Sequence, residues 1–254
     1  MSMIASGQVE FLGLDFDLRP AIAVRAWLGE RNAASDFAYV VTPNVDHIVR
    51  LSKANEAVWR AYRGAALCVC DSRILSGLAR LCGVTLPVTT GSDLVHALFH
   101  DILVARDEIC LIGGSAELAA ELACRFPALV IHHHAPPMGL AGDREARARA
   151  AAFAAQAAAR VTLLAVGSPQ QELLALDMAR SGTARGTALC IGAGVEFLLG
   201  IRARAPRPIQ RLGLEWAWRL LVEPRRMWRR YLVDGPAIFP LVWRWRRARG
   251  RSAR

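Results

Sequence analysis

The sequence predicts an α/β fold, a Rossmann-like and mostly parallel sheet with helices on both faces, followed by a helical C-terminal appendage. Through the first 200 residues, short and nearly uninterrupted apolar segments alternate with stretches of helix length. Such apolar segments are typical of parallel strands that are buried on both faces. The last 54 residues have a different composition, rich in arginine and tryptophan. They therefore predict a separate, surface-oriented segment.

The order of elements follows from the apolar segments. We expect strands at residues 9–12, 38–41, 67–70, 108–112, 129–132, 161–166 and 188–191. Amphipathic or alanine-rich stretches between them, such as 45–62, 92–105 and 170–181, predict helices. Sheets of this kind bind ligands in the crevice beyond the carboxyl ends of their strands. The segments that directly follow the strands are therefore the expected place of a site.

The charge of the chain changes at about residue 200, which predicts two parts, 1–200 and 201–254. The second part has fifteen arginines against three acidic residues, and five of the seven tryptophans; the first has seventeen basic and nineteen acidic side chains. Prolines predict an extended connector at 204–208, followed by helices at 209–222, from Pro224 onward and at 236–249. Arginine mixed with tryptophan and aliphatic residues suits a surface that meets phosphate groups and the interfacial layer of a membrane.

The sequence predicts a cytoplasmic protein that is peripheral at the inner face of the cell membrane. No stretch reaches the roughly 18 uninterrupted apolar residues of a membrane-spanning helix, and no basic segment followed by an apolar run marks a signal peptide. The six cysteines lack the spacing of a zinc site and favour buried, reduced thiols. Asp15-Phe16-Asp17 is expected in a β-turn, and consecutive histidines at 132–134 do not converge on one ion, so no metal site is predicted.

Polar residues and glycines follow five of the predicted strands. These segments are Thr42-Pro43-Asn44, Asp71-Ser72, Gly113-Gly114-Ser115, residues 167–172 and Gly192-Ala193-Gly194. Asp71 stands where a general base is often found, although an N-cap of the next helix explains it equally well. Thr42 and Asn44 offer polar groups at the mouth of the crevice, with helix capping as the alternative. The glycine turns suit a phosphate at a helix N-terminus, but no GxGxxG or Walker pattern is present.

Taken together, these segments resemble the WecG/TagA/CpsF family of bacterial glycosyltransferases. The likeness covers roughly residues 7–240 and is densest at 42–44, 167–172, 204–206 and 213–230. It implies a core that binds a UDP-sugar and an appendage that reaches the membrane and completes the active site. It also implies metal-independent, inverting transfer of the sugar to a polyprenyl-diphosphate-linked saccharide in the synthesis of a surface polymer.

The same resemblance implies roles for individual residues. Asp71 would be the general base, and Thr42 and Asn44 would line the acceptor or sugar pocket. The donor and the phosphates would meet residues of the glycine turns, of the 167–172 segment and of the appendage: Gly113, Gly114, Gln171, Glu172, Gly192, Arg219, Arg226, Arg229 and Arg230. The family usually has lysine where Gln170 stands here. Without that cation, the arginines of the appendage would have to neutralise more of the diphosphate charge.

Two other interpretations of the basic appendage are compatible with its composition. A nucleic-acid-binding protein without catalytic activity would explain the sequence pI of about 10.3. The segregation of the charge beside a large apolar core, and the lack of a known nucleic-acid-binding module, argue against nucleic acid as a partner. A homo-oligomer, in which the apolar face of the appendage packs on a neighbouring subunit, is compatible with catalysis.

Overall fold

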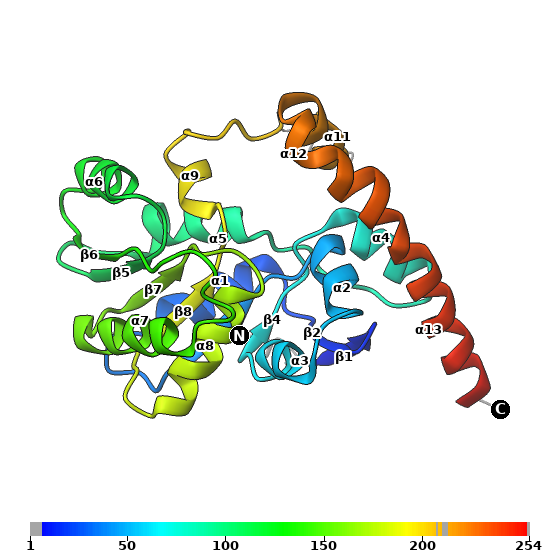
Figure 1. Ribbon diagram of the computed structural model, residues 1–254, viewed down its shortest axis with the longest axis horizontal. Helices are drawn as coiled ribbons and strands as arrows, with labels where there is room; N and C mark the ends of the chain where they lie inside the picture. Colours follow the sequence, from blue (N-terminus) through cyan, green and yellow to red (C-terminus); the bar gives the residue numbers. More distant parts are fainter. Residues whose placement is uncertain (1–6, 207, 210–212, 253–254) are drawn as a thin grey trace.

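A six-stranded, fully parallel sheet forms the centre of the protein, in the order β4-β3-β8-β7-β5-β6 (Figure 1). The computed structural model describes residues 7–206, 208–209 and 213–252. The strands are β3 (Ala38–Val41), β4 (Leu67–Cys68), β5 (Glu108–Ile112), β6 (Val130–His134), β7 (Val161–Leu164) and β8 (Thr187–Cys190). The predicted α/β fold with a parallel sheet is therefore confirmed.

Helices cover both faces of this sheet. One face packs on α1 (Ala21–Glu30), α5 (Gly91–Ala97) with its extension η1 (Leu98–Ile102), α6 (Ala116–Arg125) and α9 (Gly194–Leu198). The other packs on α2 (Val45–Leu51), α3 (Glu56–Arg63), α4 (Arg73–Leu81), α7 (Arg144–Ala157) and α8 (Gln170–Ser181). Successive strand residues alternate between the faces: Ile109 and Leu111 belong to the first core, and Cys110 and Ile112 to the second. Burial on both sides explains the continuous apolar segments.

The structure differs from the expected elements at several boundaries. The stretch 45–62 forms two helices, because the Asn55 side chain accepts a hydrogen bond from the backbone of Val58 and starts α3. Strand β4 pairs with β3 over two residues, and β6 continues to His134. The expectation of a β-turn at Asp15-Phe16-Asp17 is wrong. These residues lie in β2 (Leu14–Asp17), which forms an antiparallel hairpin with β1 (Gln8–Phe11).

The C-terminal segment is helical and runs along one side of the core (Figure 1). Residues 204–206 of the predicted connector have no regular structure; residue 207 of the connector and 210–212 of the predicted helix at 209–222 lie outside the described residues. The described helices are α11 (Glu215–Val222), α12 (Pro224–Trp228), η2 (Arg229–Asp234), η3 (Gly235–Ala237) and α13 (Ile238–Ser252). We call residues 213–252 the C-terminal helical segment. As predicted, Pro224 begins a new helix, because its missing N–H is not needed in the first turn.

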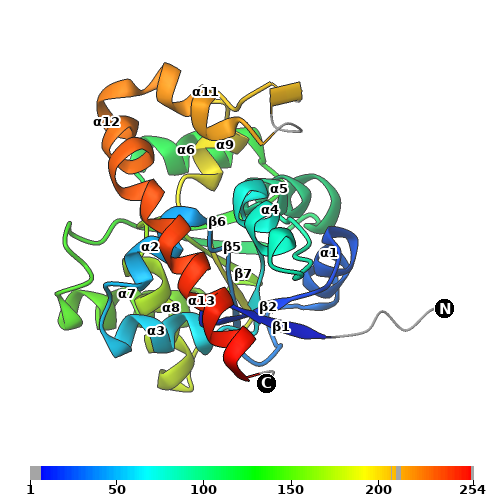
Figure 2. The ribbon, with the colours of Figure 1, turned by 90° about the vertical axis from the view of Figure 1, so that its right-hand side faces the viewer.

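Helix α13 lies across the β1–β2 hairpin and beside α2 (Figure 2). Its residues Ile238 and Val242 are buried against the core, and Trp245 packs its ring edge-on against Phe11 at a centroid distance of 4.8 Å. The indole Nε1 of Trp245 also donates to Glu10 Oε1 at 2.9 Å. The opposite side of the segment leaves large apolar residues exposed, among them Leu221, Trp228, Leu232, Phe239 and Trp243. Among the described residues, no helix is long and apolar enough to cross a membrane.

Candidate active site

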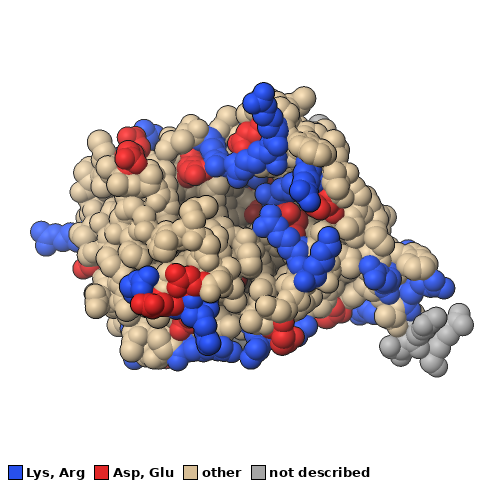
Figure 3. All heavy atoms as spheres, viewed as in Figure 1, with Lys and Arg blue, Asp and Glu red and all other residues tan. Residues whose placement is uncertain are grey.

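A polar cleft lies at the carboxyl ends of β3, β4, β7 and β8. Its cavity measures about 250 Å³, and residues that follow these four strands line it together with arginines of the C-terminal helical segment. Figure 3 shows the hollow and the arginine side chains that gather beside it. The sheet therefore brings most of the predicted polar junctions to one place, as its parallel topology requires.

Asp71 lies in this cleft, two residues beyond the buried Val69. Its backbone N–H donates to the Pro43 carbonyl at 3.0 Å, which ties the segment to the loop after β3. Ser72 provides the N-cap of α4, because its Oγ accepts from the Leu75 backbone at 3.1 Å. Capping therefore does not explain Asp71. Burial raises the pKa of its carboxyl to about 7, although Arg219 acts in the opposite direction. A carboxyl with this pKa suits a general base near neutral pH.

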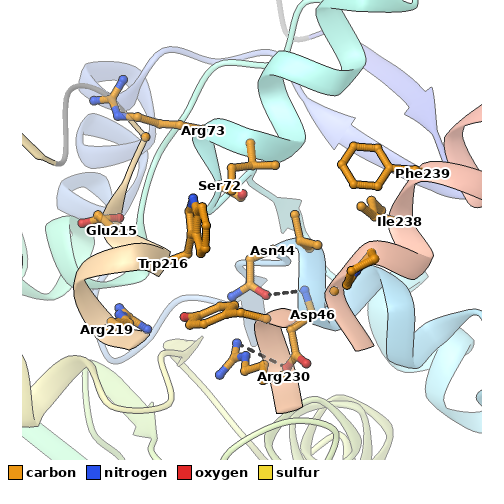
Figure 4. Close-up of a pocket in the computed structure, with 16 residues that line it drawn as sticks. Asn44, Asp46, Ser72, Arg73, Glu215, Trp216, Arg219, Arg230, Ile238 and Phe239 are labelled. Carbon is orange, nitrogen blue, oxygen red and sulfur yellow. Dashed lines mark hydrogen bonds and ion pairs between the residues drawn. The ribbon is translucent and has the colours of Figure 1, made fainter. Parts of the chain in front are cut away.

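Thr42 and Asn44 line the same cleft but have different structural roles. The Oγ1 of Thr42 donates to the Cys190 carbonyl at 3.2 Å, which joins the ends of β3 and β8. Asn44 is the N-cap of α2, because its Oδ1 accepts from the Asp46 backbone at 3.0 Å. Capping thus applies to Asn44 and not to Thr42. The amide nitrogen of Asn44 points away from the helix it caps (Figure 4), so this side chain also presents a donor to its surroundings.

Gln171 and Glu172 form a buried network beneath the cleft. The Gln171 Nε2 donates to Glu172 Oε1 at 2.9 Å, and its Oε1 accepts from the Gly192 backbone at 3.0 Å. Tyr62 donates its hydroxyl to the same Glu172 oxygen at 3.1 Å. Burial raises the pKa of the Glu172 carboxyl above its ordinary value, although its hydrogen bonds act in the opposite direction. Both amide atoms of Gln171 are therefore used in holding the loops after β7 and β8, and Glu172 supports them from a fully buried position.

The two glycine turns occupy different places. Gly192 lines the cleft with a φ of 52°, a left-handed conformation that favours glycine. Gly113 and Gly114 follow β5 and do not line this cavity. A Cβ on Gly113 would lie 2.8 Å from the Ala165 carbonyl carbon, so close packing of the β5 and β7 ends accounts for this glycine. The structure thus brings Gly192, but not the Gly113-Gly114 turn, to the predicted site.

Three of the four predicted arginines reach the cleft. Arg219, Arg226 and Arg230 line it, whereas the Arg229 side chain is 76% exposed and approaches Asp234 at 4.0 Å. Arg230 pairs with Asp46 at 3.2 Å. Arg219 lies over the Phe197 ring, 5.0 Å from its centroid, and pairs with no carboxylate in the part of the chain that the structure describes. It is therefore available for an anionic ligand.

A second, mainly apolar cavity of about 310 Å³ adjoins the polar cleft (Figure 4). It lies between α2 and α4 of the core and the helices α11, η2 and α13. Asn44, Asp46, Glu215, Arg219 and Arg230 line both cavities. The C-terminal helical segment therefore closes one side of the site as well as contributing charge to it.

The chain matches the model of the glycosyl transferase WecG/TagA/CpsF family over residues 9–252. It belongs to this family. Because the match includes the C-terminal helical segment, core and segment together are the unit that the family shares. Membership implies a glycosyltransferase of surface polysaccharide synthesis, with a sugar donor and a lipid-linked acceptor.

Several residues that line this cleft were not predicted from the sequence. His47 is half-buried and lines the cleft, and desolvation together with the charges of Arg230 and Arg50 lowers the pKa of its imidazole to about 3, which keeps the ring neutral. Arg50 donates to the Ser168 carbonyl at 3.2 Å and pairs with Asp46 at 2.9 Å. His47 and Arg50 could have been predicted from their helical spacing after Asn44, because this spacing places both on the side of α2 that is turned toward the cleft.

No metal centre accompanies this site among the residues that the structure describes. Within the described part of the chain, no group of three or more His, Cys, Asp or Glu side chains is arranged to hold an ion. Asp17 instead accepts a hydrogen bond from the Arg19 backbone at 2.8 Å, and His132 contacts Glu108 at 2.7 Å. Asp17 and His132 thus have structural partners.

Proposed function

We propose that this protein is an inverting glycosyltransferase that moves a hexosyl or N-acetylhexosaminyl group from a UDP-sugar to a polyprenyl-diphosphate-linked saccharide. The product would enter the synthesis of a bacterial surface polysaccharide or exopolysaccharide. The observation that carries the proposal is the meeting, in one cleft, of Asp71 with Arg219, Arg226 and Arg230. A base and a group of cations are the two elements that this transfer requires.

Asp71 is the proposed general base. An acceptor hydroxyl attacks the anomeric carbon as its proton passes to the Asp71 carboxylate, and the bond between that carbon and the UDP oxygen breaks. One displacement of this kind inverts the configuration at the anomeric carbon. The bonding electrons leave with UDP, so negative charge grows on its diphosphate. Guanidinium groups match phosphate oxygens in a planar, two-pronged geometry and stabilise that charge, which allows the reaction without a metal ion.

The cleft divides into a donor side and an acceptor side. We place the donor over the ends of β7 and β8, where Gly192 leaves the backbone open and the buried Gln171–Glu172 network holds the loops. The acceptor saccharide lies toward Asp71, Thr42 and Asn44. In this arrangement Gln171 shapes the donor site through the loops that it joins.

The exposed side of the C-terminal helical segment is the proposed membrane-binding surface. It combines exposed apolar residues such as Trp228, Leu232 and Trp243 with arginines along α13. Such a surface binds the interface of an anionic bilayer, which would place the enzyme at the inner face of the cell membrane. Competition between anionic vesicles and duplex DNA at equal salt concentration tests this assignment. Preference for DNA would favour the nucleic-acid-binding alternative.

The proposed reaction is tested with purified protein, a panel of UDP-sugars and a short-chain polyprenyl-diphosphate saccharide. We expect mass spectrometry to find one added sugar with at least one donor, and NMR to find an inverted anomeric configuration. The activity should persist in EDTA. Hydrolysis without transfer, a retained configuration or a strict need for a divalent cation would contradict the mechanism.

A further inference from the structure

The apolar cavity beside the polar cleft has no role in the chemistry described above. Its walls carry Val45 from α2, Ile74 from α4, Trp216 from α11, Tyr231 from η2, and Ile238 and Phe239 from α13. Its volume of about 310 Å³ is near the lower end of the range for small-molecule sites, about 300 to 1,000 Å³. A cavity of this size and lining can hold a short apolar group.

Charge is distributed unevenly around this cavity. Arg219, Arg230 and Asp46 lie together along one side, Arg73 and Glu215 lie at another edge, and Trp216, Ile238 and Phe239 flank the centre (Figure 4). The side with Arg219, Arg230 and Asp46 is the wall shared with the polar cleft that contains Asp71. A ligand that occupies both cavities would therefore place an anionic group at the shared wall and an apolar group beyond it.

The apolar cavity also adjoins the exposed apolar surface. Phe239 lines the cavity, yet its side chain is 59% exposed, and Trp243, one helical turn later on α13, is 57% exposed. From the core outward, the order is thus the base Asp71, the guanidinium groups, the apolar cavity and the apolar surface. This is the order of saccharide, diphosphate and lipid in a lipid-linked acceptor.

We infer that this cavity binds the isoprene units next to the diphosphate of the acceptor. The inference rests on the proposed function and identifies where the lipid part of the substrate lies. A prenyl chain has no hydrogen-bonding groups, so it suits a cavity lined mainly by apolar side chains. A saccharide would leave hydroxyl groups without partners there, which is unfavourable. The cavity thus selects the acceptor by its lipid and holds its diphosphate at the shared wall, near Arg219 and Arg230.

The unmodified full-length chain provides the first test. Calorimetry, without vesicles or detergent, would compare inorganic diphosphate with farnesyl diphosphate below its micelle concentration. Each buried methylene contributes roughly fourfold in affinity, so we expect farnesyl diphosphate to bind at least about tenfold more tightly. Equal affinities would overturn the inference.

Two matched variants separate the cavity from the exposed surface. Ile74→Trp fills the cavity from a side chain that is already 37% exposed, whereas Leu232→Trp enlarges a residue of the exposed surface outside the cavity. We expect Ile74→Trp to remove most of the farnesyl advantage while inorganic diphosphate and UDP bind as before, and Leu232→Trp to keep it. A retained advantage in Ile74→Trp, or its loss in Leu232→Trp, would contradict the assignment. Ile74→Phe provides a milder version if Ile74→Trp does not bind UDP.

Failure of this inference is distinguishable from failure of the proposed function. If no UDP-sugar is transferred to any diphosphate-linked saccharide, the proposed function is wrong. If transfer occurs at the same rate to acceptors with a prenyl chain and with a methyl group in its place, the function stands and the cavity assignment is wrong.

Discussion

The core and the C-terminal helical segment are held in place by different means. The sheet is buried between two apolar cores on its opposite faces, whereas the segment buries few large side chains, notably Met227, Ile238 and Val242. Polar contacts complete its attachment: Arg230 with Asp46 at 3.2 Å at the cleft, and Trp245 with Glu10 at 2.9 Å at the hairpin. The core is thus ordered by packing, and the segment is positioned by a few anchors that leave one side open. This difference predicts that catalysis and membrane binding respond to different substitutions.

Replacing the proposed base in the core is expected to have the largest effect. Asp71→Asn keeps the shape of the side chain but removes its ability to accept the proton, so turnover should fall by roughly 10²-fold or more. The UDP affinity, measured by calorimetry, should change little. Asp101→Asn alters an exposed carboxylate that does not line the cleft and serves as the control. Near-native turnover of Asp71→Asn would remove this residue from the mechanism.

The next largest effect is expected from the cation that the segment supplies. Arg219→Gln removes a charged hydrogen-bond donor to the diphosphates, worth about 1.5 to 3 kcal/mol, so kcat/KM should fall about 10- to 100-fold. Arg229→Gln is the matched control, because this arginine lies on the same segment with its side chain 76% exposed. Steady-state kinetics should find it within about twofold of the native enzyme. Equal losses in both variants would show that the total charge, and not the position of Arg219, matters.

The pH dependence of the reaction should report the core carboxyl. Burial raises the pKa of Asp71 to about 7, so below this pH the carboxyl is protonated in the folded protein and cannot accept a proton. We expect kcat/KM to rise about tenfold between pH 6 and pH 8 and then to level off. A profile that is flat over this range would show that another group is the base.

The smallest effects are expected from substitutions on the two sides of α13, which should change different properties. Trp245→Ala loses the edge-on contact with Phe11 and the hydrogen bond to Glu10, and should lower the free energy of unfolding by about 1 kcal/mol. Trp243→Ala, on the exposed side, should change stability by less than about 0.5 kcal/mol but weaken binding to anionic vesicles. Urea unfolding and vesicle sedimentation measure the two quantities. Equal vesicle binding by native protein and Trp243→Ala would contradict the assignment of this side to the membrane.

Much of the fold and part of the site could be predicted because they depend on local pattern. Apolar segments identified the strands of the sheet, and parallel strands end at one edge, which brought Thr42, Asp71 and Gly192 together. Boundaries were less predictable. The Asp15-Phe16-Asp17 segment was assigned to a turn because its acidic residues hide the pairing of Val9 with Phe16 in the hairpin. The pairing with the neighbouring strand β1, which the composition of the segment itself does not show, decides this case.

The members of the site were harder to predict than its location. Gly113-Gly114 resembles the other glycine turns in sequence, but β5 lies beyond β7 in the sheet order, so its end does not reach the cleft cavity. The resemblance assigned Arg226, Arg229 and Arg230 alike to the donor and its phosphates, whereas only Arg226 and Arg230 line the cleft, and the π-helical turn η2 begins at Arg229. The order of the strands and the change of helix geometry at η2 both depend on how distant segments pack, so neither can be predicted from the local sequence.

From the amino-acid sequence alone follow the parallel α/β core, the carboxylate at a strand end and the concentration of arginine and tryptophan near the C-terminus. These properties depend on periodicity and composition, which each segment carries within itself. The tertiary structure alone decides which arginine meets Asp71, that Asn44 both caps α2 and lines two cavities, and that an apolar cavity lies between α4 and α13. Each of these requires segments more than 100 residues apart to pack against one another, and the relative placement of such segments is a property of the whole folded chain.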